Sequence, residues 1–100
     1  MNSRRMQETV ELTHRARISP EVIAQKIGDE TILLNMESGT YYGLNATGTR
    51  LWELLAESKS LRAVLDQMIV EYAAKPEVLK EDILRLVHEM QAKCLIEVVG

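Results

Sequence analysis

The sequence predicts an α+β protein in which a three-stranded antiparallel sheet precedes three helices. Apolar residues alternate with a period close to two between residues 22 and 44, and they recur every three or four residues further on. Hydrophobic residues make up 46% of the 100-residue chain, with no Phe, so Leu, Ile, Val and Met must fill the core. A chain of this length forms one domain and buries enough surface to fold without disulfide bonds.

Three short segments have the features of strands. They are "VIAQKI" at 22–27, "TILLNM" at 31–36 and "TYYGL" at 40–44, which are rich in branched and aromatic side chains. Gly28 and Gly39 lie in the short polar segments between them, where a tight turn often needs a residue with positive φ. We therefore expect a meander of three antiparallel strands.

Three helices are predicted after Leu44, each with one apolar face. Asn45 or Thr47 can cap the first helix, Ser60 can cap the second, and Pro76 suits the first turn of the third. A helix with a single apolar stripe is not stable alone, so we expect all three to pack against one face of the sheet. The apolar faces consist of Leu51, Leu54 and Leu55; Leu61, Val64, Leu65, Met68, Ile69 and Tyr72; and Leu79, Ile83, Leu86, Val87 and Met90.

Two residues of the first helix have predicted structural roles. Gly48 is a poor helix former in the first turn, which is understandable if the start of the helix approaches another backbone closely. Trp52 flanks the apolar face and is expected to belong to the core or its border and not to contact a ligand.

The ends of the chain differ from this predicted core. Residues 1–19 are polar and have no persistent period, so they are expected to form a flexible N-terminal arm, and the folded domain to span 20–100. Pro20 blocks a helix at the boundary. The apolar run "CLIEVV" at 94–99 predicts a short terminal strand or tail.

The compartment predicted is the cytoplasm. The N-terminal segment has no apolar stretch of the signal-peptide type, and no apolar run approaches the length of a membrane span. Cys94 is the single cysteine, which excludes an internal disulfide and favours a reducing environment. It follows the apolar face of the third helix and is expected to be a small buried hydrophobic residue.

The sequence offers no set of residues for catalysis, a metal or a cofactor. His14 and His88 belong to no HxxxH or HxxE pair, and His88 with Cys94 supplies at most two ligands, too few for zinc. Glu81 and Asp82 are adjacent on a helix and point about 100° apart, which does not make a catalytic pair. We therefore predict a binding protein and not an enzyme.

Two kinds of binding remain open from the residues alone. The alternative to peptide binding is a winged-helix DNA-binding regulator, but a net charge of −3 disfavours it. The third helix would read DNA with equal numbers of basic and acidic side chains, namely Lys80, Arg85, His88 and Lys93 against Glu77, Glu81, Asp82 and Glu89.

Peptide capture by strand addition is favoured because the strand 40–44 has no Lys or Pro to discourage pairing. Tyr and Thr in this strand favour pairing with a further strand. Ordinary sheet packing of Tyr41, Tyr42 and Leu44 remains the other interpretation of the same side chains.

The segment "ILLNMESGTYYGLNATGTRLWELL", followed by "LRAVLDQMIVEY" and "DILRLVHEMQAKCLIEVV", resembles the PqqD-like family of RiPP precursor peptide recognition elements. The resemblance spans about residues 18–98. It implies a compact winged-helix-like fold without catalytic activity. It also implies binding of the leader region of a ribosomally made precursor peptide, which is presented to a modifying enzyme.

The resemblance also implies where the leader binds and with which partner. The leader would lie as an extra antiparallel strand on 40–44, facing the third helix. The partner enzyme would be a leader peptidase, as in lasso peptide maturation, or a radical SAM enzyme, as in pyrroloquinoline quinone synthesis. The strand resembles lasso-type members more. The main-chain partners would be Thr40, Tyr41, Tyr42, Gly43 and Leu44, and the cleft wall would be Leu79, Ile83, Leu86 and Val87.

Two features depart from the family pattern, and one is the polar segment 1–17, which has no clear counterpart in it. The other is the end of the third helix. Many members end the third helix with Gly in a "KGL" sequence, where this chain has Cys94. We therefore expect that helix to end later or with a different cap.

Overall fold

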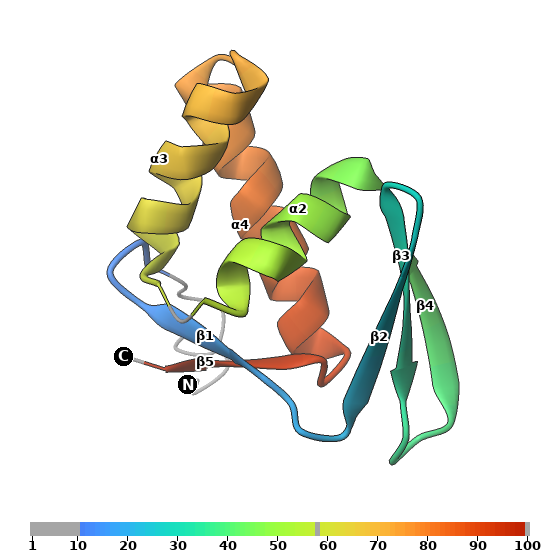
Figure 1. Ribbon diagram of the computed structural model, residues 1–100. Coiled ribbons are helices and arrows are strands. Elements are labelled where there is room, and N and C mark those ends of the chain that lie inside the picture. The colour runs from blue at the N-terminus through green and yellow to red at the C-terminus, as the bar shows by residue number, and fades with distance from the viewer. Residues whose placement is uncertain (1–10, 58, 100) are drawn as a thin grey trace.

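A computed structural model describes residues 11–57 and 59–99 and confirms the α+β architecture (Figure 1). A three-stranded antiparallel sheet is followed by the helices α2, α3 and α4, as the sequence predicts. A second, two-stranded sheet joins the two ends of the described chain. The elements are β1 (Arg15–Ile18), β2 (Val22–Ile27), β3 (Glu30–Asn35), β4 (Thr40–Leu44), α2 (Ala46–Leu55), α3 (Leu61–Tyr72), α4 (Pro76–Ala92) and β5 (Ile96–Val99).

The larger sheet has the strand order β2-β3-β4 and is built from two tight connections. Gly28 has a φ of 65° at the first position of the two-residue turn between β2 and β3, where type II′ turns require glycine. Gly39 has a φ of 72° between β3 and β4. In this second loop the buried Oδ1 of Asn35 accepts hydrogen bonds from the N–H groups of Glu37 (2.9 Å) and Ser38 (3.3 Å), so the side chain holds the loop closed.

The smaller sheet corrects the expectation of a flexible arm for residues 11–19. β1 pairs antiparallel with β5, Ala16 is 4% exposed within the core, and Nη1 of Arg17 lies 3.6 Å from Oε1 of Glu97. The sequence "RARI" does alternate, but four residues are too few to distinguish a strand from a polar segment when the partner lies at the other end of the chain. The rest of the expected arm, residues 1–10, lies outside the described residues.

The segment before β1 also completes the start of α3. The carbonyl oxygens of Leu12 and His14 accept hydrogen bonds of 2.8 Å from the N–H groups of Arg62 and Leu61. The predicted cap Ser60 accepts from the N–H of Ala63 at 3.2 Å. These bonds satisfy donors that the first turn of a helix cannot pair internally, so this segment belongs to the folded unit.

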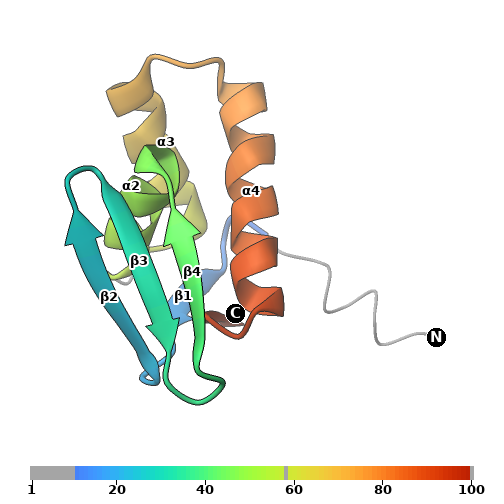
Figure 2. The ribbon, with the colours of Figure 1, turned by 90° about the vertical axis from the view of Figure 1, so that its right-hand side faces the viewer.

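Only α2 packs closely on the inner face of the larger sheet, which corrects the expectation that all three helices lie on it (Figures 1 and 2). α3 packs against α2 and α4, and α4 packs against α3 and β5. Oγ1 of Thr49 donates to Oγ1 of Thr31 over 2.9 Å, and both side chains are buried, so this bond connects α2 to β3. Asn45 caps α2 through its Oδ1, which accepts from the N–H of Gly48 at 2.9 Å. A Cβ on Gly48 would lie 3.4 Å from the Leu44 Cβ, so the close approach expected here is made to side chains and not to another backbone.

The core lies among the helices, β3 and the β1–β5 pair. It contains the predicted apolar faces except Tyr72, which is 38% exposed, while Ile69 and Leu86 are partly buried at its border. Trp52 is 7% exposed, in agreement with the structural role predicted for it. Among the described residues, no helix is both long enough and apolar enough to cross a membrane. The side chains exposed by less than 2% that define the centre of the core are Leu33, Leu51, Leu54, Leu55, Leu61, Met68, Ile83, Leu95, Val64 and Val87.

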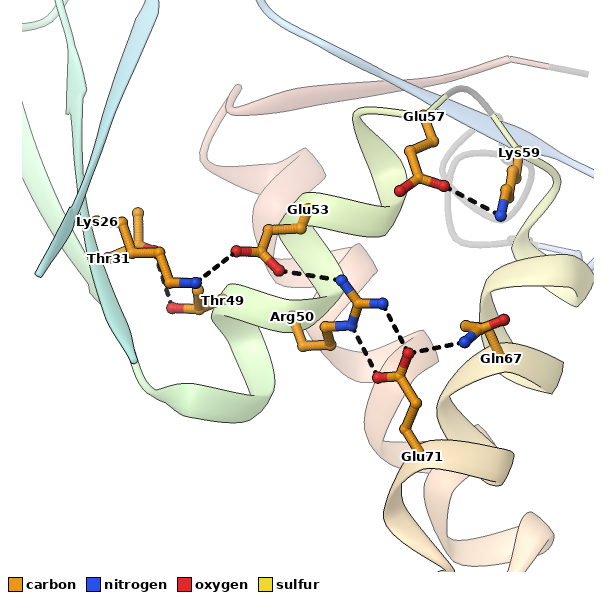
Figure 3. Close-up of polar contacts among 9 residues, drawn as sticks. All are labelled: Lys26, Thr31, Thr49, Arg50, Glu53, Glu57, Lys59, Gln67 and Glu71. Carbon is orange, nitrogen blue, oxygen red and sulfur yellow. Dashed lines mark hydrogen bonds and ion pairs between the residues drawn. The ribbon is translucent and has the colours of Figure 1, made fainter. Parts of the chain in front are cut away.

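An ion-pair network on the surface connects β2, α2 and α3 (Figure 3). Arg50 donates from Nε and Nη2 to the two carboxylate oxygens of Glu71 over 2.8 and 2.6 Å, and from Nη1 to Glu53 over 3.1 Å. Lys26 donates to the other oxygen of Glu53 over 3.0 Å. Hydrogen bonds from Arg50 and then Gln67 lower the pKa of Glu71 to about 2, and those from Lys26 and then Arg50 lower the pKa of Glu53.

We expect Glu71→Gln to destabilise the protein at neutral pH and to matter less as the pH falls. The pKa of Glu71 is lowered from 4.5 to about 2, so its ionised form stabilises the fold above pH 4.5. That contribution is lost as the pH falls through about 2. Urea unfolding of both proteins across this range measures the difference. Glu57→Gln is the control, because Glu57 pairs with Lys59 and both side chains are exposed, so this pair contributes little to stability. If Glu71→Gln lowered the free energy of unfolding by the same amount at every pH, the ionised carboxylate of Glu71 would not be the stabilising form.

The backbone at the end of α4 turns at Cys94. Cys94 is exposed and has a φ of 60°, which corrects the expectation of a buried side chain. The N–H of Leu95 donates to the carbonyl oxygen of Met90 (2.9 Å), and the N–H of Cys94 donates to the carbonyl oxygen of Gln91 (3.0 Å). This is the Schellman pattern that usually has glycine at the left-handed position, so the cap is unchanged and cysteine occupies a strained conformation.

Cys94→Gly should therefore stabilise the protein. A left-handed conformation costs a residue with a Cβ about 1–2 kcal/mol, and the greater freedom of glycine in the unfolded chain offsets about 0.5–1 kcal/mol of that gain. Chemical denaturation should show a net increase of up to about 1.5 kcal/mol in the free energy of unfolding. Lys93→Gly, one residue earlier at a φ of −91°, is the matched control and should destabilise. A loss of stability in both variants would contradict the strain at Cys94.

Candidate functional site: the free edge of β4 and its cleft

Among the residues that the structure describes, β4 is an edge strand of the larger sheet. The register of the sheet determines which of its backbone groups face this edge. In an antiparallel ladder, the N–H and C=O of successive residues point to opposite sides of the strand. The two-residue turn closes on the pair Ile27–Glu30, and the N–H of Met36 bonds to the carbonyl oxygen of Glu21 over 2.8 Å. Even-numbered residues of β3 therefore bond toward β2, and odd-numbered residues bond toward β4.

The same alternation continues into β4. Thr40, Tyr42 and Leu44 lie opposite Asn35, Leu33 and Thr31 and direct their backbone groups to β3. Tyr41 and Gly43 therefore direct their N–H and C=O groups to the free edge of the sheet. The strand thus presents two donors and two acceptors for a further strand.

A cleft of about 260 Å³ lies along this edge, between β4 and α4. Figure 2 shows β4 as the strand of the larger sheet nearest to α4. The cleft has an apolar floor and charged groups on one wall. It is lined by Tyr42, Gly43, Leu44, Asn45, Gly48, Leu86, Glu89, Met90, Lys93 and Leu95.

The structure brings together part of the residue set expected for peptide binding. Tyr42, Gly43 and Leu44 line the cleft with Leu86. Thr40 and Tyr41 are exposed on the same strand, with Tyr41 68% exposed on the opposite face of the sheet.

Leu79, Ile83 and Val87 do not form the cleft wall that was expected of them. They are 5%, 0% and 0% exposed and pack in the core. Helical periodicity identifies the buried stripe of α4, whereas the cleft lies along the border of that stripe, where Leu86 is only partly buried. The three side chains therefore support the helix from within the core.

The sequence analysis did not include the charged residues of the cleft among the expected peptide-binding residues. Glu89 and Lys93 follow Leu86 by three and seven residues, so they lie on the same side of α4, and this spacing was a usable signal. Nζ of Lys93 lies 5.3 Å from the centroid of the Tyr42 ring, a cation–π contact between two residues that line the cleft. The contact favours this position of the Tyr42 ring and places a positive charge beside β4.

The chemistry of the site is suited to binding an extended chain. Residues with shifted pKa values, such as Arg50 and Glu71, belong to the network between α2 and α3 and do not line the cleft. In the part of the chain that the structure describes, no group of three His, Cys, Asp or Glu side chains can hold a metal ion. The site therefore offers backbone hydrogen bonds, an apolar floor and opposite charges.

A sheet edge beside an apolar cleft is the arrangement that peptide recognition by strand addition uses. The family model described as coenzyme PQQ synthesis protein D (PqqD) matches residues 30–96, and the chain belongs to this family. This confirms the resemblance seen in the sequence.

A solved structure agrees with the family assignment. The chain is similar to TbiB1, solved in complex with the TbiA(beta) leader peptide, with 34% sequence identity and a TM-score of 0.77. The match covers 81% of this chain and 94% of TbiB1. No match was found among curated proteins.

Proposed function

We propose that this protein binds the leader region of a ribosomally synthesised precursor peptide without catalysing a reaction. The leader adds an antiparallel strand to β4, and the complex presents the rest of the precursor to a modifying enzyme. The observation that carries the proposal is that the N–H and C=O groups of Tyr41 and Gly43 face the sheet edge beside the cleft. The TbiB1 structure, which contains a leader peptide, supports the same role.

The two parts of the site have different tasks. Backbone bonds at Tyr41 and Gly43 hold any extended chain in register, because they do not depend on side-chain identity. Side chains of the leader that point into the cleft contact Leu86, Tyr42 and Met90 and provide selectivity. Ordering a disordered segment costs about 2–5 kcal/mol, so these apolar contacts are needed for useful affinity.

The partner enzyme is a leader peptidase or a radical SAM enzyme, and it acts where the precursor is made, in the cytoplasm. The genes beside the one for this chain distinguish the two pathways. Pull-down of the enzyme that each adjacent gene encodes, with and without the precursor, then tests whether the protein presents the bound peptide to that enzyme or only binds it.

Binding itself is tested with two probes. One is the TbiA(beta) leader peptide, and the other is a display library of random 12-residue peptides selected on the intact protein. We expect selected peptides to bind with micromolar or tighter affinity in calorimetry and to shift the amide NMR signals of Tyr41 and Gly43. The proposal fails if no peptide from either source perturbs the β4 edge. If the protein bound duplex DNA in a salt-dependent way and bound no peptide, the alternative of a winged-helix DNA-binding regulator would be favoured.

A further inference from the structure

We propose that the β4 edge has a second subsite, on the face of the sheet that points away from the helices. It takes one bulky apolar side chain of the bound peptide, preferably an aromatic one. The inference rests on the proposed strand addition and specifies which peptides are accepted.

The subsite is a hollow of about 260 Å³ at the end of the sheet that contains the β2–β3 turn. Ile27 and Ile32, which are 56% and 42% exposed, provide its apolar surface. Gly43 lies directly opposite Ile32 in the ladder and leaves the hollow open, because it has no side chain. The lining residues are Ile27, Glu30, Thr31, Ile32, Gly43, Leu44 and Asn45.

The hollow and the cleft beside α4 meet at the same stretch of β4. Gly43, Leu44 and Asn45 line both. Side chains of a strand alternate between the two faces of a sheet. A peptide strand added to β4 therefore directs the residue beside Gly43 over the hollow and the residues before and after it toward the cleft.

The backbone at Gly43 does not require glycine. Its φ lies outside the left-handed region, and a Cβ built there meets no atom within 4 Å. Glycine weakens a strand, and in a strand it often marks a site that another chain approaches closely. An aromatic side chain on a neighbouring strand can cover such a glycine. The missing side chain is therefore explained by a peptide residue that covers Gly43 and contacts Ile32.

The test compares Gly43→Val with the unchanged protein in the same peptide selection. Valine suits a strand, so the free energy of unfolding should be maintained or increased, which excludes loss of the fold as the cause of weaker binding. Peptides selected on the unchanged protein should share a bulky apolar residue at one position. Against Gly43→Val, these peptides should bind about tenfold more weakly, and new selections should contain small residues at that position. Gln25→Val, on β2 and the same sheet face, is the control. It should change neither the affinity of the original peptides nor the residue preferred in new selections.

The outcomes separate this inference from the function on which it rests. Peptides that bind at β4 with no preference at the position beside Gly43 would overturn the second subsite and leave strand addition intact. The same holds if Gly43→Val binds the original peptides unchanged. If no selected peptide perturbs the β4 edge, strand addition fails and the subsite fails with it.

Discussion

Gly43→Pro is expected to weaken leader binding at least tenfold while the protein stays folded. The N–H of Gly43 points to the free edge of β4, so proline removes a donor that the peptide needs and leaves the ladder to β3 intact. The loss of that hydrogen bond and the bulk of the ring at the edge act together. Proline is tolerated on an edge strand when the missing N–H would face solvent.

The opposite edge of the same sheet provides a matched control. Ala24 on β2 pairs with Leu33, so its N–H also points away from the sheet, and Ala24→Pro makes the same chemical change at the other edge. Both variants should have similar circular dichroism spectra and similar denaturation midpoints. Calorimetry with a selected peptide should show lost affinity for Gly43→Pro only. Equal affinity in both variants, with both folded, would exclude β4 as the docking edge.

Ile83→Ala and Leu86→Ala should separate stability from binding within one helix. Ile83 is 0% exposed in the core, and truncation of such a side chain leaves a cavity that costs about 2–5 kcal/mol. Leu86 is partly buried and lines the cleft, so its truncation should cost less stability and weaken leader binding about tenfold.

Urea denaturation and calorimetry on both variants test this division, with peptide affinity measured well below each denaturation midpoint. Leu86→Met is the conservative control and should restore most of the affinity, since methionine has a similar volume. If folded Ile83→Ala bound the peptide more weakly than Leu86→Ala, Ile83 would have to belong to the cleft wall. It would also contradict the position of the cleft along the border of the buried stripe.

Local patterns were sufficient for most of the fold. The apolar periods located β2, β3, β4 and the helices, and the caps Asn45 and Ser60 are those that residue type predicts. The strand β1 was missed because its four residues gain their stability from pairing with β5 at the other end of the chain. Cys94 was misjudged because its exposure depends on a backbone turn that its residue type does not favour.

The candidate site was predictable only in part, for a similar reason. The strand half of the site follows from residue types and order, because an edge strand without Lys or Pro is visible in the sequence. The helix half depends on the rotation of α4 about its axis, which decides that Ile83 faces the core and Leu86 the cleft.

The sequence alone therefore determined the class of fold, the order of its elements and the strand proposed to receive a peptide. These properties depend on the preferences of neighbouring residues for strands, turns and helices. Only the tertiary structure decided which backbone groups of β4 are unpaired, which side of α4 lines the cleft and where Gly43 leaves a hollow. Each of these depends on the register or packing of segments that are distant in the sequence.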